Sequence, residues 1–152
     1  MSPASDLDPD ARVLETLRTH GQREDAILES YRRLVEASHD EGLRYLGRLI
    51  IEDEERHHHV IAEMANRIDS WIQGTEIEPS VPALVPRFDP ILLEETHRLI
   101  ELEHGDAKEL RLLERELRYA PATSLLPLLV RLMLQDTARH IEILQFIRSY
   151  TG

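Results

Sequence analysis

The sequence predicts an all-α fold in which four long amphipathic helices form a four-helix bundle. Three observations support this prediction. Apolar residues recur at intervals of three and four over most of the chain, which is the period of one helix face. An Asp-Pro pair, typical of a helix start, occurs at Asp8-Pro9 and again at Asp89-Pro90. No segment shows the alternating pattern expected of a half-buried β-strand.

The first two helices are predicted on either side of a short turn. The first covers residues 9–37, after a disordered tail of residues 1–8, and has Asp8 as its N-cap. The second covers residues 41–73 and ends at Gly74, since glycine readily adopts the left-handed conformation of a helix C-cap. The apolar stripe of the first helix passes through Val13, Leu17, His20, Glu24, Ile27/Leu28, Tyr31 and Leu34/Val35.

Residues 74–89 interrupt the helical pattern with Pro79, Pro82 and Pro86. Proline inside a helix removes a backbone hydrogen bond, so we expect an irregular connection here. Extended at about 3.3 Å per residue, this segment reaches about 50 Å, which is also the length of a helix of about 33 residues. It is therefore predicted to be a crossover that carries the chain back along the whole bundle, giving an up-down-down-up order.

The third and fourth helices are predicted to form a second hairpin. The third covers residues 90–119 and the fourth covers residues 124–150, with Thr123 or Ser124 as its N-cap. Pro127 falls in the first turn of the fourth helix, where its missing N–H costs little. A chain of 152 residues is long enough to bury a sizeable core, so we expect residues 9–152 to form one domain.

The composition excludes several classes of function. The formal net charge is -11, whereas nucleic acids and anionic membranes bind basic surfaces, so neither partner is expected. The absence of cysteine rules out a disulfide scaffold, a thiolate metal site and a thiol nucleophile. No apolar run approaches the roughly 18 residues of a membrane span, and the acidic N-terminus has no signal-peptide pattern. We therefore expect a cytoplasmic protein.

Two segments of the chain, 48–61 and 131–144, resemble each other. Each carries an acidic residue three or four positions before a histidine, a spacing that places both side chains on one face of a helix. The identical pairs are Arg48/Arg131, Leu49/Leu132, Asp53/Asp136, Arg56/Arg139 and His57/His140. The repeat predicts that the two halves of the chain share one architecture.

Ionisable residues interrupt each predicted stripe where an apolar residue is expected. Counting along the predicted helices brings these interruptions within about two turns of the middle of the bundle. Because charged side chains are costly in a helical core unless they are compensated, they either bind a metal or neutralise one another. Carboxylates combined with imidazoles suit iron, manganese or zinc. The interruptions are His20 and Glu24, Glu54 and His57, Glu103, and Asp136 and His140.

On these residues the chain resembles the ferritin-like superfamily, and most closely its rubrerythrin-type members. In that family each half contributes one helix with a glutamate and one helix with Glu-x-x-His, and the set holds two iron ions. Glu54-x-x-His57 matches the second-helix motif. Glu24, seven residues before Tyr31, matches the first-helix glutamate, and Glu103 fits the third-helix position. The resemblance implies a ferritin-like bundle with metal bound at its middle.

The fourth helix departs from the family pattern. Thr137 stands where the family has a glutamate, in Thr137-x-x-His140, and Asp136 is the candidate replacement. With two irons bound, the resemblance implies reduction of oxygen or peroxide coupled to iron oxidation. The electron donor would then be another protein, because no cysteine module is present. The predicted metal ligands are Glu24, Glu54, His57, Glu103, Asp136 and His140.

The alternative is a non-catalytic ferritin-like bundle that has lost its metal and acts through protein–protein contacts. It is favoured by the repeated Asp53/Arg56 and Asp136/Arg139 pairs, which are not family ligands and are interpreted as structural ion pairs. Such a protein would need no cofactor. His58 and His59 are interpreted as surface residues, and a homodimer is expected.

Overall fold

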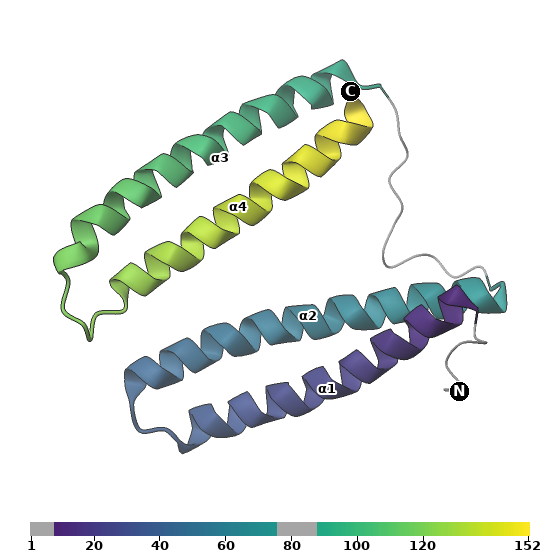
Figure 1. The fold of residues 1–152 in the computed structure, drawn as a ribbon, viewed down its shortest axis with the longest axis horizontal. Coiled ribbons are helices and arrows are strands. Elements are labelled where there is room, and N and C mark those ends of the chain that lie inside the picture. The colour runs from purple at the N-terminus through teal and green to yellow at the C-terminus, as the bar shows by residue number, and fades with distance from the viewer. Residues whose placement is uncertain (1–7, 76–87) are drawn as a thin grey trace, which may run out of the picture. The chain divides into compact units, whose positions relative to one another are not determined.

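The computed structural model describes residues 8–75 and 88–152, and its long elements are all helices. No strand occurs in these two ranges, which confirms the prediction of an all-helical chain with four long helices. Residues 1–7 of the predicted tail and residues 76–87 of the predicted crossover lie outside the described residues. The elements are α1 (Pro9–Ala37), α2 (Glu41–Gln73), α3 (Pro90–Glu116), the 3₁₀ helix η2 (Leu117–Tyr119) and α4 (Leu126–Thr151) (Figure 1).

Most of the helix ends follow from local chemistry. The side chain of Asp89 accepts a hydrogen bond from the backbone N–H of Leu92 at 3.0 Å, as expected of an N-cap. Gly74 ends α2 with a φ of 64°, which confirms the predicted left-handed C-cap. Asp8 is the N-cap of α1 as predicted, although its side chain makes no cap hydrogen bond. The predicted cap of α4 was wrong, since its N-cap position is Leu125 rather than Thr123 or Ser124.

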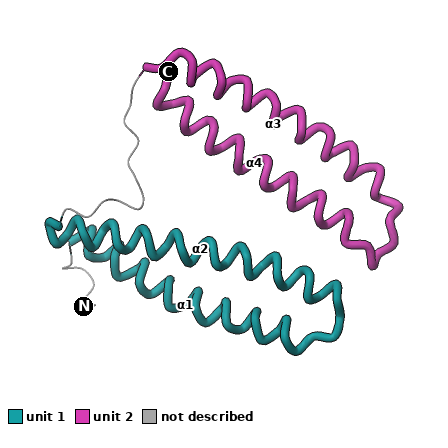
Figure 2. Tube along the Cα trace, turned by 180° about the vertical axis from the view of Figure 1, so that it is seen from behind, with its two compact units in different colours: residues 1–82 teal, residues 83–152 magenta. Residues whose placement is uncertain are grey.

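Contacts within the chain define two compact units, residues 1–82 and residues 83–152 (Figure 2). In the first unit α1 packs against α2, and in the second α3 packs against α4. Each pair runs antiparallel, so each unit is a helical hairpin, named below the first and the second hairpin. None of the described helices has both the length and the apolar character needed to cross a membrane.

The helices of the first hairpin meet along a seam. Its α1 residues are separated by three, four or seven positions, the spacing of helices that pack along a 3.5-residue repeat. On α2 the seam includes the buried Gly47, which lies against Val35. The charged residue Glu24 occupies the middle of this otherwise apolar seam. The buried residues of α1 are Leu14, Leu17, Glu24, Leu28 and Val35.

The apolar stripe predicted for α1 proves to consist of two rows of side chains, of which one is buried against α2 and the other is exposed. A single partner helix covers only the narrow seam, because the stripe of a core-facing helix is wider than one contact line. A second row of apolar side chains on α1 therefore remains 37–47% exposed, and it consists of Val13, Ile27 and Leu34.

The second hairpin has a seam of the same spacing, with more hydroxyl groups. Its buried residues are Thr96, Ile100 and Ala107 on α3, and Val130, Thr137 and Thr151 on α4. The hydroxyl of Thr96 donates to the carbonyl of Leu92 at 2.7 Å, so this buried polar group is satisfied within its own helix. The open end of the hairpin is closed by a hydrogen bond of 3.2 Å from the N–H of Asp89 to the carbonyl of Thr151.

Gly47 and Gly105 provide a matched test of the seam. A Cβ atom at Gly47 would lie 2.5 Å from Cγ2 of Val35, whereas a Cβ at Gly105 would meet nothing within 4 Å. We expect Gly47→Ala to lower the free energy of unfolding by about 1 kcal/mol, because overpacking outweighs the gain in helix propensity. Gly105→Ala should raise it by up to about 1 kcal/mol. Denaturant unfolding followed by circular dichroism measures both, and shifts of the same sign would contradict the described seam.

Candidate metal centre

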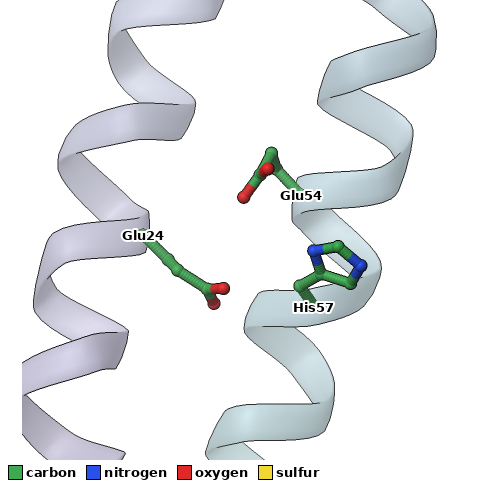
Figure 3. A group of neighbouring side chains, drawn as sticks. All are labelled: Glu24, Glu54 and His57. Atoms are coloured by element: carbon green, nitrogen blue, oxygen red, sulfur yellow. The ribbon is translucent and has the colours of Figure 1, made fainter.

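Glu24, Glu54 and His57 form a cluster inside the first hairpin. Their spacing of three places Glu54 and His57 on one face of α2, and the antiparallel packing turns that face toward α1. One potential ligand atom from each residue lies within 4.8 Å of the other two. Figure 3 shows the carboxylate of Glu24 directed toward α2 and that of Glu54 directed toward α1, with the imidazole of His57 lying against α2 beside them. The structure therefore brings together three of the six predicted ligands.

Burial falls steeply across this cluster. Glu24 is only 5% exposed, Glu54 is half-buried and His57 is exposed. The cluster is thus closed by the seam on the side of Glu24 and open to solvent on the side of His57.

The carboxylate of Glu24 is only half satisfied. Its Oε1 lies 3.1 Å from Nε2 of His20, one turn earlier on α1. Its Oε2 is buried and has no hydrogen-bond partner within the described residues. A buried acceptor without a partner costs about 1–3 kcal/mol, and more when it is charged. A cation between Glu24, Glu54 and His57 would remove this cost.

The donor set fits a transition metal. Ligand atoms lie about 2.0–2.2 Å from zinc, so two ligands of one ion are about 3–4 Å apart, slightly closer than the 4.8 Å limit of this cluster. Small rotations of the two glutamate side chains close that difference, because their terminal torsions are soft. Two carboxylates with one imidazole suit iron, manganese or zinc rather than a thiophilic metal.

In the second hairpin the ionisable residues bind one another. Nδ1 of His140 lies 3.3 Å from Oε1 of Glu103. The hydroxyl of the buried Thr137 lies 3.1 Å from Oδ2 of Asp106 and 3.0 Å from the carbonyl of Met133. Glu103, Asp106, Thr137 and His140 all line one hollow of about 520 Å³. This arrangement brings two more predicted ligands, Glu103 and His140, into direct contact.

The seams identify equivalent positions in the two hairpins. With Leu17 aligned to Thr96 and Leu28 to Ala107, Glu24 aligns with Glu103. The repeat found in the sequence aligns His57 with His140 and Glu54 with Thr137. The second hairpin therefore keeps the glutamate and the histidine but has a hydroxyl in place of the second carboxylate.

Asp106 is the residue that the sequence analysis missed. It faces Thr137 across the second hairpin, and the equivalent position on α1 is the apolar Ile27. In the second hairpin the second carboxylate thus comes from Asp106 on α3, because α4 has a threonine at position 137. A sequence signal existed in the spacing of Glu103 and Asp106, which places both on one helix face, although it did not reveal the pairing with Thr137.

Asp136, the sixth predicted ligand, lies in an ion pair with its own helix. Its Oδ1 is 2.7 Å from the guanidinium of Arg139, and both side chains are about half exposed. The first hairpin repeats this contact between Asp53 and Arg56, also at 2.7 Å. The interpretation of both as structural ion pairs is confirmed. Among the described residues, Glu24, Glu54 and His57 are the one group of three or more potential ligands as close as 4.8 Å.

The interpretation of His58 and His59 as surface residues is confirmed for His59, which is exposed, and was wrong for His58. The residue is half-buried, its Nε2 lies 3.4 Å from Oδ1 of Asp25 across the hairpin, and its Nδ1 is buried without a partner in the described residues. His58 is partly buried because the seam of α2 follows a 3.5-residue repeat, so that it passes through position 58 as well as position 54.

Comparison with known proteins gave no match, whether with family models, curated proteins or solved structures. The resemblance to the ferritin-like superfamily therefore rests on the residues alone.

Glu24 is expected to lower the stability of the metal-free protein. We predict that Glu24→Leu raises its free energy of unfolding by about 1–3 kcal/mol, because a buried acceptor without a partner is replaced by an apolar side chain. The control is Glu36→Leu on the same helix, where the side chain is exposed and the change should stay within about 0.5 kcal/mol. Denaturant unfolding in the presence of a chelator measures both. A destabilised Glu24→Leu protein would show that the carboxylate is already satisfied.

Proposed function

We propose that this chain is a ferritin-like protein that binds a divalent transition metal, with iron as the first candidate, between the helices of its first hairpin. The observation that carries the proposal is the buried carboxylate of Glu24. Its Oε2 has no hydrogen-bond partner in the described residues, and one of its oxygens lies within 4.8 Å of potential ligand atoms of Glu54 and His57. Buried charges in proteins are paired or bind metals, and this carboxylate has a hydrogen bond to only one of its oxygens.

Each of the three residues has a distinct role in the proposed site. Glu24 supplies an oxygen from the closed side, Glu54 supplies a second carboxylate, and His57 supplies a nitrogen from the open side. Three protein ligands leave coordination positions for small molecules, and bound iron would supply redox chemistry toward oxygen or peroxide. The exposed side of His57 would give such molecules access, and an external donor would supply electrons.

A ferritin-like bundle of the four helices, in up-down-down-up order, is the fold we propose around this site. It is supported by the apolar row that α1 leaves exposed, Val13, Ile27 and Leu34, because four-helix packing needs an apolar stripe wider than a hairpin seam. The polar groups of the second hairpin already satisfy one another. We therefore propose one ion per chain.

Metal titration tests the proposal directly. Protein stripped with a chelator and titrated anaerobically with Fe²⁺, or with Co²⁺ as a spectroscopic probe, is expected to bind about one equivalent per chain. His57→Leu should abolish binding. The matched control is His59→Leu, since His59 is exposed and its imidazole contacts only Glu63 among the described ion pairs. Binding of less than about 0.3 equivalents by the unmodified protein would contradict the proposal.

The rival function is a bundle that has lost its metal and acts through protein contacts, for instance as a homodimer. The mutual pairing of the ionisable residues in the second hairpin favours it, because that half shows how such a site closes without an ion. Thermal unfolding of the unmodified chain and of the Glu54→Leu/His57→Leu double variant, with and without Co²⁺, separates the two functions.

For a metal protein, free Co²⁺ at about 100 times its Kd should stabilise the unmodified chain by about 2.7 kcal/mol and leave the double variant unchanged. For the rival, Co²⁺ should have no effect on either protein, and the double variant should be as stable as the unmodified chain or more stable. A metal-induced shift of equal size in both proteins would contradict binding at Glu54 and His57.

A further inference from the structure

His20 lies one turn before Glu24 on α1 and is not part of the three-residue ligand cluster. Its Nε2 is 3.1 Å from Oε1 of Glu24, while its side chain is 46% exposed and that of Glu24 is 7% exposed. With its proton on Nε2, the imidazole donates a hydrogen bond to a buried carboxylate from the solvent side. The other carboxylate oxygen, Oε2, is left without a hydrogen-bond partner in the described residues.

The second hairpin shows what happens to the equivalent glutamate without such a histidine. The position equivalent to His20 is Leu99, one turn before Glu103. There, Glu103 pairs with His140, at 3.3 Å, which is the equivalent of the proposed ligand His57. In the first hairpin the carboxylate has its hydrogen bond from His20 instead, and among the described contacts His57 has no ion pair with Glu24. The two hairpins therefore differ in which histidine binds the seam glutamate.

We propose that His20 is a positioning residue for the metal centre. By binding Oε1 of Glu24 it fixes that carboxylate so that Oε2 is presented to an ion, and it leaves the imidazole of His57 available as a ligand. Hydrogen bonds to ligating carboxylates orient the ligand, and their loss weakens metal binding about 10- to 100-fold. The inference rests on the proposed metal binding by Glu24, Glu54 and His57.

The simpler alternative is that His20 and Glu24 form an ordinary surface pair four residues apart, of the kind that many helices carry. That reading predicts no effect on metal binding, because an exposed pair contributes little. An ordinary surface pair also does not explain why the acceptor, Glu24, is buried while the donor, His20, is exposed. Metal affinity and the spectrum of the bound ion distinguish the two readings, whereas stability alone does not.

The experiment compares the unmodified chain with His20→Leu, His20→Gln and the control His59→Leu by titration with Co²⁺. His20→Leu should weaken Co²⁺ binding about 10- to 100-fold and shift the visible absorption of bound Co²⁺, since Glu24 loses its fixed orientation. His20→Gln keeps a side-chain N–H at about the same reach, so it should recover most of the affinity and the original spectrum. His59→Leu should match the unmodified chain.

Two results would overturn the inference, and they are distinguishable. If the unmodified chain binds Co²⁺ and His20→Leu binds it with the same affinity and spectrum, the role of His20 is wrong and the proposed function stands. If the unmodified chain binds no Co²⁺, the proposed function is wrong and the inference falls with it. Circular dichroism of each variant establishes that a loss of affinity does not come from unfolding.

Discussion

The burial of Glu24 in the seam of the first hairpin is the constraint on which the rest of the site depends. Antiparallel helices with a 3.5-residue seam bury whatever stands at the seam positions, and the other buried residues of α1 are apolar. A carboxylate there must be compensated. His20 satisfies one oxygen, and the second oxygen has no hydrogen-bond partner in the described residues. The carboxylate is directed toward α2, which carries Glu54 and His57. The fold thus produces the donor cluster by fixing one charged residue where solvent cannot reach it.

The second hairpin shows another solution to the same constraint. Its seam glutamate, Glu103, is less buried than Glu24 and binds the facing histidine. Where the first hairpin has Glu54, it has Thr137, whose hydroxyl binds Asp106. Among the described residues, no buried side-chain nitrogen or oxygen of this half lacks a hydrogen-bond partner, so the hairpin does not depend on a ligand to satisfy a buried polar group. The two halves share a seam but differ in how their central charges are compensated.

This difference connects stability to function. A site that holds charged groups ready for a ligand is less stable without that ligand, and proteins commonly accept such a cost at functional positions. A hairpin whose polar groups satisfy one another avoids the cost but offers an ion no vacant oxygen. The surface ion pairs Asp53–Arg56 and Asp136–Arg139 have the same 2.7 Å distance in both hairpins. These two ion pairs recur with the sequence repeat and take no part in compensating the central charges of either hairpin.

The sequence by itself determined the helices and their approximate bounds. Local signals suffice for this, because the Asp-Pro starts, Gly74 and the apolar period act over a few residues. The sequence also predicted that Glu24, Glu54 and His57 lie close together. The spacing of three places Glu54 and His57 on one face of α2, and counting residues along the two helices places Glu24 at the same height.

Only the tertiary structure decided which side chains pair across a hairpin. The contacts of Asp106 with Thr137 and of Glu103 with His140 were geometrically open in the sequence, whereas the pair of Asp136 with Arg139 within one helix was predicted. The choice depends on the register of one helix against the other, which local patterns leave free within about one turn. A shift of one residue rotates a side chain by about 100° around its helix, and that rotation separates a buried carboxylate from an exposed ion pair.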